Sequence, residues 1–200
     1  MNFKSYLTSE YPSRAIIALH GWTGDINSME PFTKVLKLKD TKWIVPEAPY
    51  LATGNGFSWF EGNDSIGWKY DESFRILTTI INNLKDDGFN KNNIFIIGFS
   101  QGACLSMEYL IRQKFSLGGI IPIAGFIKYK KRVKAESTQS SKKTPILLLH
   151  GKSDKIVDPK ESNQSYKILK ELGYVPKLEL FAGGHKIPIQ AQAIIQDFIY

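Results

Sequence analysis

Residues 98–102 read GFSQG and follow directly on the apolar run IFII at 94–97. A serine between two glycines, at the end of a strand and the start of a helix, predicts a sharp turn that lifts the hydroxyl of Ser100 above the edge of a sheet. Gly98 and Gly102 are then needed sterically, because strand and helix come too close there for larger side chains. The motif therefore predicts a central strand with a helix packed against it, and it makes Ser100 a candidate nucleophile.

The length and composition favour one folding unit. The chain has 200 residues, of which 42% are hydrophobic, and this is enough for one core but leaves little for a second. We expect residues 1–200 to form a single domain. Cys104 is the only cysteine, which excludes an intrachain disulfide, and the first residues lack the apolar core of a signal sequence. These features predict a cytoplasmic protein.

The formal net charge of +7 is concentrated in one segment. Residues 128–143, here called the basic segment, contain seven lysines and arginines against Glu136 alone, a balance of +6. A solvated loop is one interpretation, and a weak contact with anionic lipid or an acidic partner is the other. No pattern of a nucleic-acid-binding module accompanies the segment, so we expect no nucleic-acid partner. We also expect no membrane span, since no apolar run approaches the roughly 20 residues that one requires.

Apolar runs alternate with amphipathic segments along the chain. This rhythm predicts an α/β fold with a mostly parallel central sheet and helices on both faces. Strands are expected at residues 15–19, 43–45, 94–97, 119–124, 146–149 and 177–181, and a candidate antiparallel edge strand at 3–7. Helices are expected at residues 29–38, 71–86, 101–113, 159–172 and 189–198.

Residues 46–69 form the longest stretch without a clear element, and they contain four glycines and five aromatic residues. A loop of this length inside a compact domain usually has a function. Two interpretations stay open: the aromatic side chains form an apolar wall beside a reaction centre, or they pack over an edge of the sheet.

Ser100 needs partners if it is to act as a nucleophile. A serine hydroxyl reacts slowly at neutral pH unless an imidazole accepts its proton and a carboxylate orients that imidazole. Of the three histidines, His20 and His150 come too early for the chain order serine, acid, histidine. His185, which follows two glycines after the last predicted strand, fits that order. We predict that His185 is the base.

Two carboxylates follow the strand predicted at 146–149. Asp154 comes first in the loop, near the carboxyl edge of the sheet where the other groups should gather. Asp158 directly precedes Pro159, a position typical of the residue that caps the next helix. We therefore predict a catalytic triad of Ser100, Asp154 and His185.

An acyl-transfer site also needs donors for the oxyanion of its transition state. One should be the backbone N–H of Gln101, the residue after the nucleophile, and the other should come from the loop after an early strand. In residues 20–25 we choose the N–H of Trp22, with Thr23 in reserve; a plain turn is the alternative. Cys104, one helical turn beyond Ser100, is expected to be a buried small residue and not a second nucleophile.

Four segments, at residues 19–25, 98–102, 150–157 and 183–188, together resemble the signatures of the phospholipase/carboxylesterase family of α/β hydrolases. The resemblance implies a single-domain α/β hydrolase with no separate lid domain, no metal and no organic cofactor. It implies a serine carboxylic-ester hydrolase that acts on a small-molecule ester through an acyl-enzyme. An acyl-protein thioesterase or a lysophospholipase with the same triad is the alternative, and a hydrolase-like binding protein without catalysis is a third possibility.

A pocket for the acyl group is expected beside Ser100. The candidate lining consists of one residue from the loop at 20–25, three from the aromatic stretch and one after the strand predicted at 119–124. These residues are Thr23, Phe57, Trp59, Phe60 and Phe126.

Overall fold

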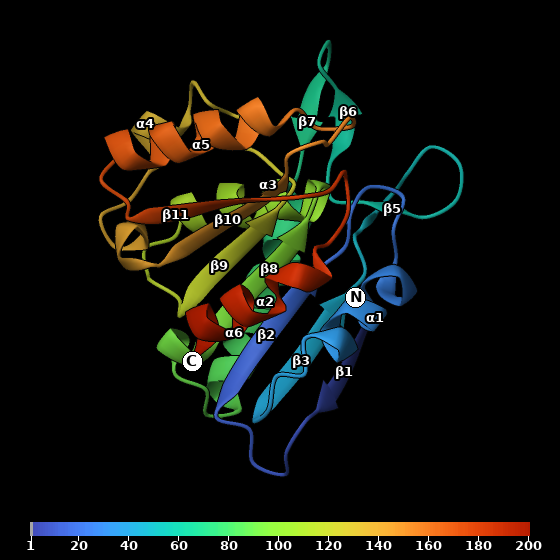
Figure 1. The fold of residues 1–200 in the computed structure, drawn as a ribbon, viewed down its shortest axis with the longest axis vertical. Helices are drawn as coiled ribbons and strands as arrows, with labels where there is room; N and C mark the ends of the chain where they lie inside the picture. The colour runs from blue at the N-terminus through green and yellow to red at the C-terminus, as the bar shows by residue number, and fades with distance from the viewer. Residues whose placement is uncertain (1) are drawn as a thin grey trace.

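A central sheet with helices on both faces forms the body of the molecule (Figure 1), as the computed structural model shows for residues 2–200. The strand order is β1-β3-β2-β8-β9-β10-β11. The bounds are β1 (Phe3–Leu7), β2 (Arg14–Leu19), β3 (Thr41–Pro46), β8 (Ile94–Phe99), β9 (Gly119–Ile123), β10 (Ile146–Gly151) and β11 (Pro176–Phe181). β1 pairs with β3 in the antiparallel sense, whereas every other pairing in this sheet is parallel. The predicted fold class and the edge strand are confirmed.

Side chains of successive residues enter two separate cores. Along β2, Ile17 belongs to the core on one face of the sheet and Ile16 to the core on the other. The first core is closed by α2 (Asp71–Asp86), α3 (Gln101–Ile111) and α5 (Pro159–Glu171), and the second by α1 (Ile26–Val35) and α6 (Gln192–Ile199). The five inner strands are therefore buried at nearly every position, whereas the edge strands β1 and β11 are partly exposed.

The predicted helix at 29–38 begins earlier, at Ile26. Asp25 is its N-cap: its carboxylate accepts the N–H of Ser28 at 2.8 Å, and the Ser28 hydroxyl accepts the N–H of Asp25 at 2.9 Å. This reciprocal capping box satisfies two donors at the start of the helix. The last predicted helix is also divided, into the short turn η3 (Ile189–Ala191) and α6.

Several short elements were not predicted from the sequence. The stretch at 46–69 folds into two small hairpins, β4 (Tyr50–Leu51) with β5 (Phe57–Ser58) and β6 (Glu61–Asn63) with β7 (Gly67–Lys69). The basic segment contains the short helix α4 (Val133–Glu136) and the turn η2 (Ser141–Lys143), and the turn η1 (Lys91–Asn93) precedes β8. Elements of two to four residues are too short for apolar alternation to reveal them.

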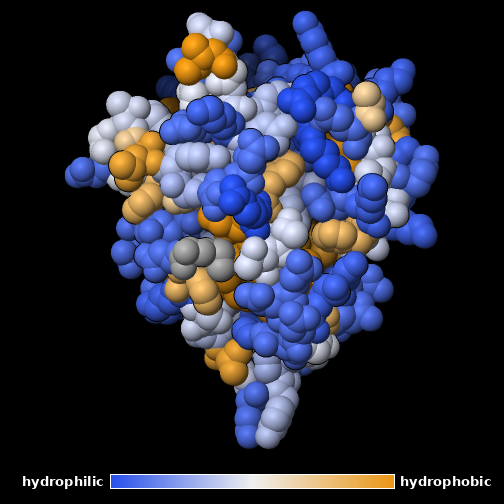
Figure 2. All heavy atoms as spheres, turned by 180° about the vertical axis from the view of Figure 1, so that it is seen from behind, coloured by the Kyte–Doolittle hydropathy of each residue, from blue (hydrophilic) through white to orange (hydrophobic). Residues whose placement is uncertain are grey.

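The surface is mixed in character. On the face drawn in Figure 2, hydrophobic side chains form small patches separated by hydrophilic ones. Within residues 2–200, no helix has the length and apolar character needed to cross a membrane.

Candidate active site

The turn between β8 and α3 holds Ser100 at the carboxyl end of a central strand. Its φ of 52° and ψ of −113° lie in a region that residues with a Cβ rarely adopt. The glycines beside it are required by close approach: a Cβ on Gly102 would come within 2.5 Å of the Leu19 carbonyl oxygen, and one on Gly98 within 2.6 Å of the Ala103 nitrogen. The steric reason expected for the GFSQG motif is confirmed.

The structure brings Ser100, His185 and Asp154 together from three loops at this edge of the sheet. His185 Nε2 lies 3.0 Å from Ser100 Oγ, and His185 Nδ1 lies 2.7 Å from Asp154 Oδ2. The loops after β10 and β11 are tied to each other, because the Ser153 N–H donates to the Gly183 carbonyl at 2.9 Å. In this arrangement the serine hydroxyl donates to Nε2 while Nδ1–H donates to the carboxylate.

Asp154 is buried, with 7% of its surface exposed, yet its surroundings favour the charged form. Burial by itself raises the pKa of Asp154. The N–H groups of Val157 and Ile156, each donating to Oδ1 at 2.9 Å, and the ring of His185 outweigh that effect. Together they hold the pKa of this carboxyl below its usual value, so that it can act as an acceptor.

The imidazole of His150 also lies beside Asp154, and the sequence alone did not identify it as a residue of the site. Its Nε2 lies 3.2 Å from Asp154 Oδ2 and 2.9 Å from the Val157 carbonyl oxygen, and its Nδ1 lies 2.5 Å from Ser162 Oγ. Since both partners of Nε2 are acceptors, that nitrogen must carry a proton. The signal available in the sequence was a histidine at the end of a strand, four residues before the predicted acid.

Asp158 has the capping role expected of it. Its carboxylate accepts the N–H of Lys160 at 2.9 Å, Pro159 opens α5, and the side chain is 58% exposed. It makes no hydrogen bond to His185 among the described residues.

The loop at residues 20–25 lies directly beside Ser100. A Cβ on Gly21 would be 3.4 Å from the Cβ of Ser100. The Thr23 N–H donates to the Phe57 carbonyl at 3.0 Å, so the reserve donor is already engaged. For the N–H groups of Trp22 and Gln101, the described part of the chain supplies no acceptor. The Gln101 N–H also opens α3, where unpaired N–H groups and the helix dipole favour negative charge.

His20 holds this loop in place instead of acting on substrate. Its Nδ1–H donates to the Gly21 carbonyl at 2.7 Å, and its Nε2 accepts the Ala48 N–H at 3.1 Å. These two bonds define a neutral tautomer. Burial lowers the pKa of His20, and this outweighs the nearby groups that would raise it.

A pocket of about 130 Å³ opens beside Ser100. It is lined by Phe60, Trp68, Ser100, Gln101, Cys104, Phe126, Lys128 and Val157. Phe60 and Phe126 are thus where we expected acyl-pocket residues. Cys104 is buried at the base, as predicted, and burial raises the pKa of its thiol to about 12.

The other three residues chosen for the pocket do not line it. Trp59 is fully buried, and its indole N–H donates to the His20 carbonyl at 2.9 Å, so this ring belongs to the core. Phe57 packs against the same core, and Thr23 faces solvent from a left-handed turn with a φ of 62°. We correct these three positions: Thr23, Phe57 and Trp59 are absent from the lining of the pocket.

The aromatic side chains of residues 46–69 therefore lie in two environments. Phe60 and Trp68 form a wall at the pocket, whereas Trp59 packs inside. The side chain of Gln101 links residues 46–69 to the turn that holds Ser100. Its Oε1 accepts the Trp59 N–H at 2.7 Å, and its Nε2 donates to Ser58 Oγ at 3.0 Å. A second hollow of about 440 Å³ adjoins the first and shares Phe60 and Trp68 with it.

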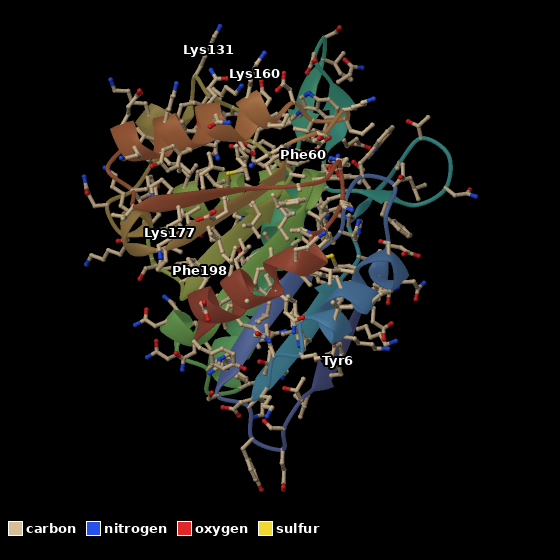
Figure 3. All side chains as sticks on the ribbon, in the orientation of Figure 1. Tyr6, Phe60, Lys131, Lys160, Lys177 and Phe198 are labelled. Carbon is tan, nitrogen blue, oxygen red and sulfur yellow. The ribbon has the colours of Figure 1, made fainter. Side chains whose placement is uncertain are left out.

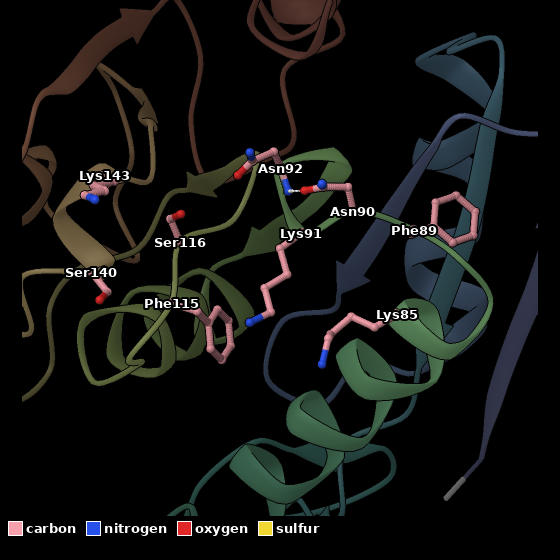
Figure 4. A pocket seen from close by; sticks show the side chains of 9 residues that line it. All are labelled: Lys85, Phe89, Asn90, Lys91, Asn92, Phe115, Ser116, Ser140 and Lys143. Atoms are coloured by element: carbon pink, nitrogen blue, oxygen red, sulfur yellow. Dashed lines mark hydrogen bonds between the residues drawn. The ribbon is translucent and has the colours of Figure 1, made fainter.

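The surface hollow drawn in Figure 4 lies away from this chemistry, at the edge of the sheet where β8 begins. It is lined by Lys85, Phe89, Asn90, Lys91, Asn92, Phe115, Ser116, Ser140 and Lys143. It contains no histidine, cysteine or carboxylate. Among residues 2–200 there is also no group of three or more His, Cys, Asp or Glu side chains placed to hold a metal ion.

Comparison with known proteins places the chain among ester hydrolases. The model of the family described as Phospholipase/Carboxylesterase matches residues 7–200. Carboxylesterase SOBER1 of Arabidopsis thaliana is 28% identical over 92% of this chain and 88% of its own length. Acyl-protein thioesterase 1 of Neurospora crassa is 26% identical over 90% and 80%. The crystal structure of Arabidopsis SOBER1 is similar at a TM-score of 0.83, with 26% identity, over 93% of this chain and 97% of that one.

Proposed function

Because the chain belongs to the phospholipase/carboxylesterase family of α/β hydrolases, we propose that it hydrolyses carboxylic esters through an acyl-enzyme formed on Ser100. The family resemblance of the sequence is confirmed, and the chain is an ester hydrolase. The observation that carries the assignment of residues is the continuous line from Ser100 Oγ to His185 Nε2, 3.0 Å, and from His185 Nδ1 to Asp154 Oδ2, 2.7 Å. This is the arrangement that a serine nucleophile requires.

The proposed reaction has two halves with the same proton transfers. Ser100 Oγ attacks the carbonyl carbon while His185 Nε2 takes the hydroxyl proton, and the N–H groups of Gln101 and Trp22 stabilise the oxyanion. His185 then gives the proton to the leaving alcohol, and the acyl group stays on Ser100. Water then attacks the acyl carbon while His185 takes its proton; His185 returns that proton to Ser100 Oγ as the bond to the acyl group breaks and the acid is released. Asp154 stays ionised throughout and stabilises the imidazolium of each half-reaction.

The same groups would also cleave a thioester or a lysophospholipid, because only the leaving group differs. The acyl-protein thioesterase among the relatives keeps the thioester alternative open for this chain. A panel of 4-nitrophenyl esters of rising chain length, with an acyl-CoA and a lysophospholipid, separates these substrate classes. A cytoplasmic location stays a prediction.

A fluorophosphonate probe tests the proposal. The probe reacts only with an activated serine, so we expect one label on Ser100 in the folded protein and none in Ser100→Ala. Ser100→Ala and His185→Ala should each lower turnover by several orders of magnitude, and the double variant should be little worse than either, because the residues act as a unit. A folded protein that is neither labelled nor active would be the non-catalytic binding protein, and additive losses would contradict the triad.

A further inference from the structure

Lys128 places a positive charge in the pocket of the nucleophile. It lines the same pocket as Ser100, and its Nζ lies 3.9 Å from the ring centroid of Trp68 and 5.7 Å from that of Phe60. Both rings are walls of that pocket. The indole of Trp68 is itself held, since its N–H donates to Asp64 Oδ1 at 2.8 Å. The ammonium group is therefore positioned by a fixed aromatic face.

No carboxylate pairs with Lys128 within residues 2–200, although two nearby cations of the basic segment are paired. Lys130 Nζ lies 2.6 Å from Glu161 Oε2, and Arg132 Nε lies 2.7 Å from Glu136 Oε1. Among the described residues its partners are the rings of Trp68 and Phe60, and Lys128 is half-buried. A cation at such a site keeps the capacity to bind an anion directly.

The rest of the pocket carries no competing charge. Phe60, Phe126 and Val157 are apolar, and the buried thiol of Cys104, with a pKa of about 12, is neutral at physiological pH. The adjoining hollow is lined by one carboxylate, Glu61, which is paired with Lys69 at 3.4 Å, and the Asp64 carboxylate accepts the indole N–H of Trp68. The only formal charge in the lining of the pocket beside Ser100 is thus positive.

We propose that Lys128 determines the substrate class: the arm of the ester that enters this pocket bears a carboxylate a few bonds from the scissile carbonyl. Apolar walls would contact the intervening carbons, and the ammonium would pair with the carboxylate in a partly desolvated place, where such a pair is stronger than in water. This inference rests on the proposed function, because it concerns the ester that Ser100 attacks.

The test compares charged and neutral esters of matched size. In the first pair, mono-4-nitrophenyl glutarate carries a carboxylate on its acyl arm and 4-nitrophenyl pentanoate is the neutral match. In the second pair, 3-acetoxybenzoate carries the carboxylate on its alcohol arm and phenyl acetate is the neutral match. We expect the wild-type protein to prefer the charged ester of one pair in kcat/KM by about 10- to 100-fold, the range of a hydrogen bond to a charged group. In Lys128→Met the ratio of kcat/KM for the charged ester to that for the neutral ester should fall to about 1, because the charged ester loses its partner.

Methionine suits this test because it keeps an apolar stem over Trp68 and removes only the charge. The matched control is Lys131→Met, which removes a charge from the same segment at an exposed side chain that points away from the body of the molecule (Figure 3). This control should keep the preference. Neutral esters hydrolysed with no charge preference, or a preference that survives in Lys128→Met, would overturn the inference and leave the proposed function standing. Failure to hydrolyse any ester would overturn both.

Discussion

Ser100 occupies a backbone conformation that costs about 1–3 kcal/mol in a residue with a Cβ. Its N–H donates to the Ile123 carbonyl at 2.8 Å, and its carbonyl accepts the Cys104 N–H at 3.0 Å, so β9 and α3 hold the turn from both sides. The surrounding structure thus over-determines a geometry that the residue alone would avoid, and the hydroxyl stays raised toward His185.

Substitution of the two aspartates in the loop after β10 should affect turnover very differently. Asp154→Asn should lower turnover by about three to four orders of magnitude, because an amide no longer holds the correct tautomer of His185. Asp158→Asn should have little effect, since asparagine caps a helix about as well as aspartate. Steady-state kinetics on one short ester measures both. An inactive Asp158→Asn beside an active Asp154→Asn would reverse the assignment.

His150 provides a further test of how Asp154 is held. We expect His150→Ala to reduce kcat by about 10- to 100-fold with little change in KM, because the ring that bonds to the Val157 carbonyl and lies 3.2 Å from Asp154 Oδ2 no longer positions the carboxylate. His150→Gln, whose amide can donate from a position similar to that of Nε2, should recover part of the loss. Unfolding curves of both variants serve as the control for stability. Equal activity in all three proteins would make His150 a packing residue only.

The loop at residues 20–25 has to present a backbone N–H beside Ser100 while its other polar groups are bonded. Its carbonyl and N–H groups bond to Phe57, to Gly21 and to the ring of His20, and these bonds leave the N–H of Trp22 without an acceptor in the described chain. Trp22 is 55% exposed, so its side chain is not what anchors the loop. The backbone of this residue therefore carries the proposed role.

Two substitutions distinguish the backbone of Trp22 from its side chain. Trp22→Ala keeps the N–H, and we expect it to retain most of the activity. Trp22→Pro removes the donor and should lower kcat by about 10²- to 10³-fold, the cost of losing one oxyanion donor. Circular dichroism checks that both variants fold. Similar activity in two folded variants would assign the second donor to another group.

For the molecule as a whole, the sheet separates two cores, and a few buried polar groups lie at its carboxyl edge. His20 is among them, with 1% of its surface exposed. Its folded-state pKa is below the usual value, so the native protein holds it neutral, whereas the unfolded chain binds a proton below about pH 6.5. The stability that neutral His20 contributes is therefore complete above that pH and is lost as the pH falls toward its folded-state pKa.

Urea unfolding between pH 7.5 and 5 measures this effect. We expect the free energy of unfolding to fall below about pH 6.5, with a slope from His20 of at most about 1.4 kcal/mol per pH unit. His20→Asn, which has no titrating ring, should be less stable at pH 7.5 but show a flatter pH dependence. Parallel curves for the two proteins would contradict the role of His20 titration.

The order of motifs along the chain was enough to predict the α/β fold, the family and the choice of Ser100, Asp154 and His185. Few residues can occupy these positions. A serine between two glycines fits the close turn from strand to helix, and the order serine, acid, histidine excluded two of the three histidines. The capping role of Asp158 was equally local, because Asp-Pro before an amphipathic run is a helix start. Such features depend on near neighbours in sequence, which is why they could be predicted.

Tertiary structure alone decided which side chains of residues 46–69 line the pocket. It also decided the partners of His150 and Lys128. Trp59 and Phe60 are adjacent, and both are buried in the same core, yet Phe60 also lines the pocket and Trp59 does not. The backbone N–H of Trp59 donates to Gln101 and its indole N–H to the His20 carbonyl, and both partners are distant along the chain. His150 meets Asp154, and Lys128 meets Trp68, only because the loops after separate strands converge at one edge of the sheet. A contact between segments distant along the chain leaves no local pattern, and packing alone determines it.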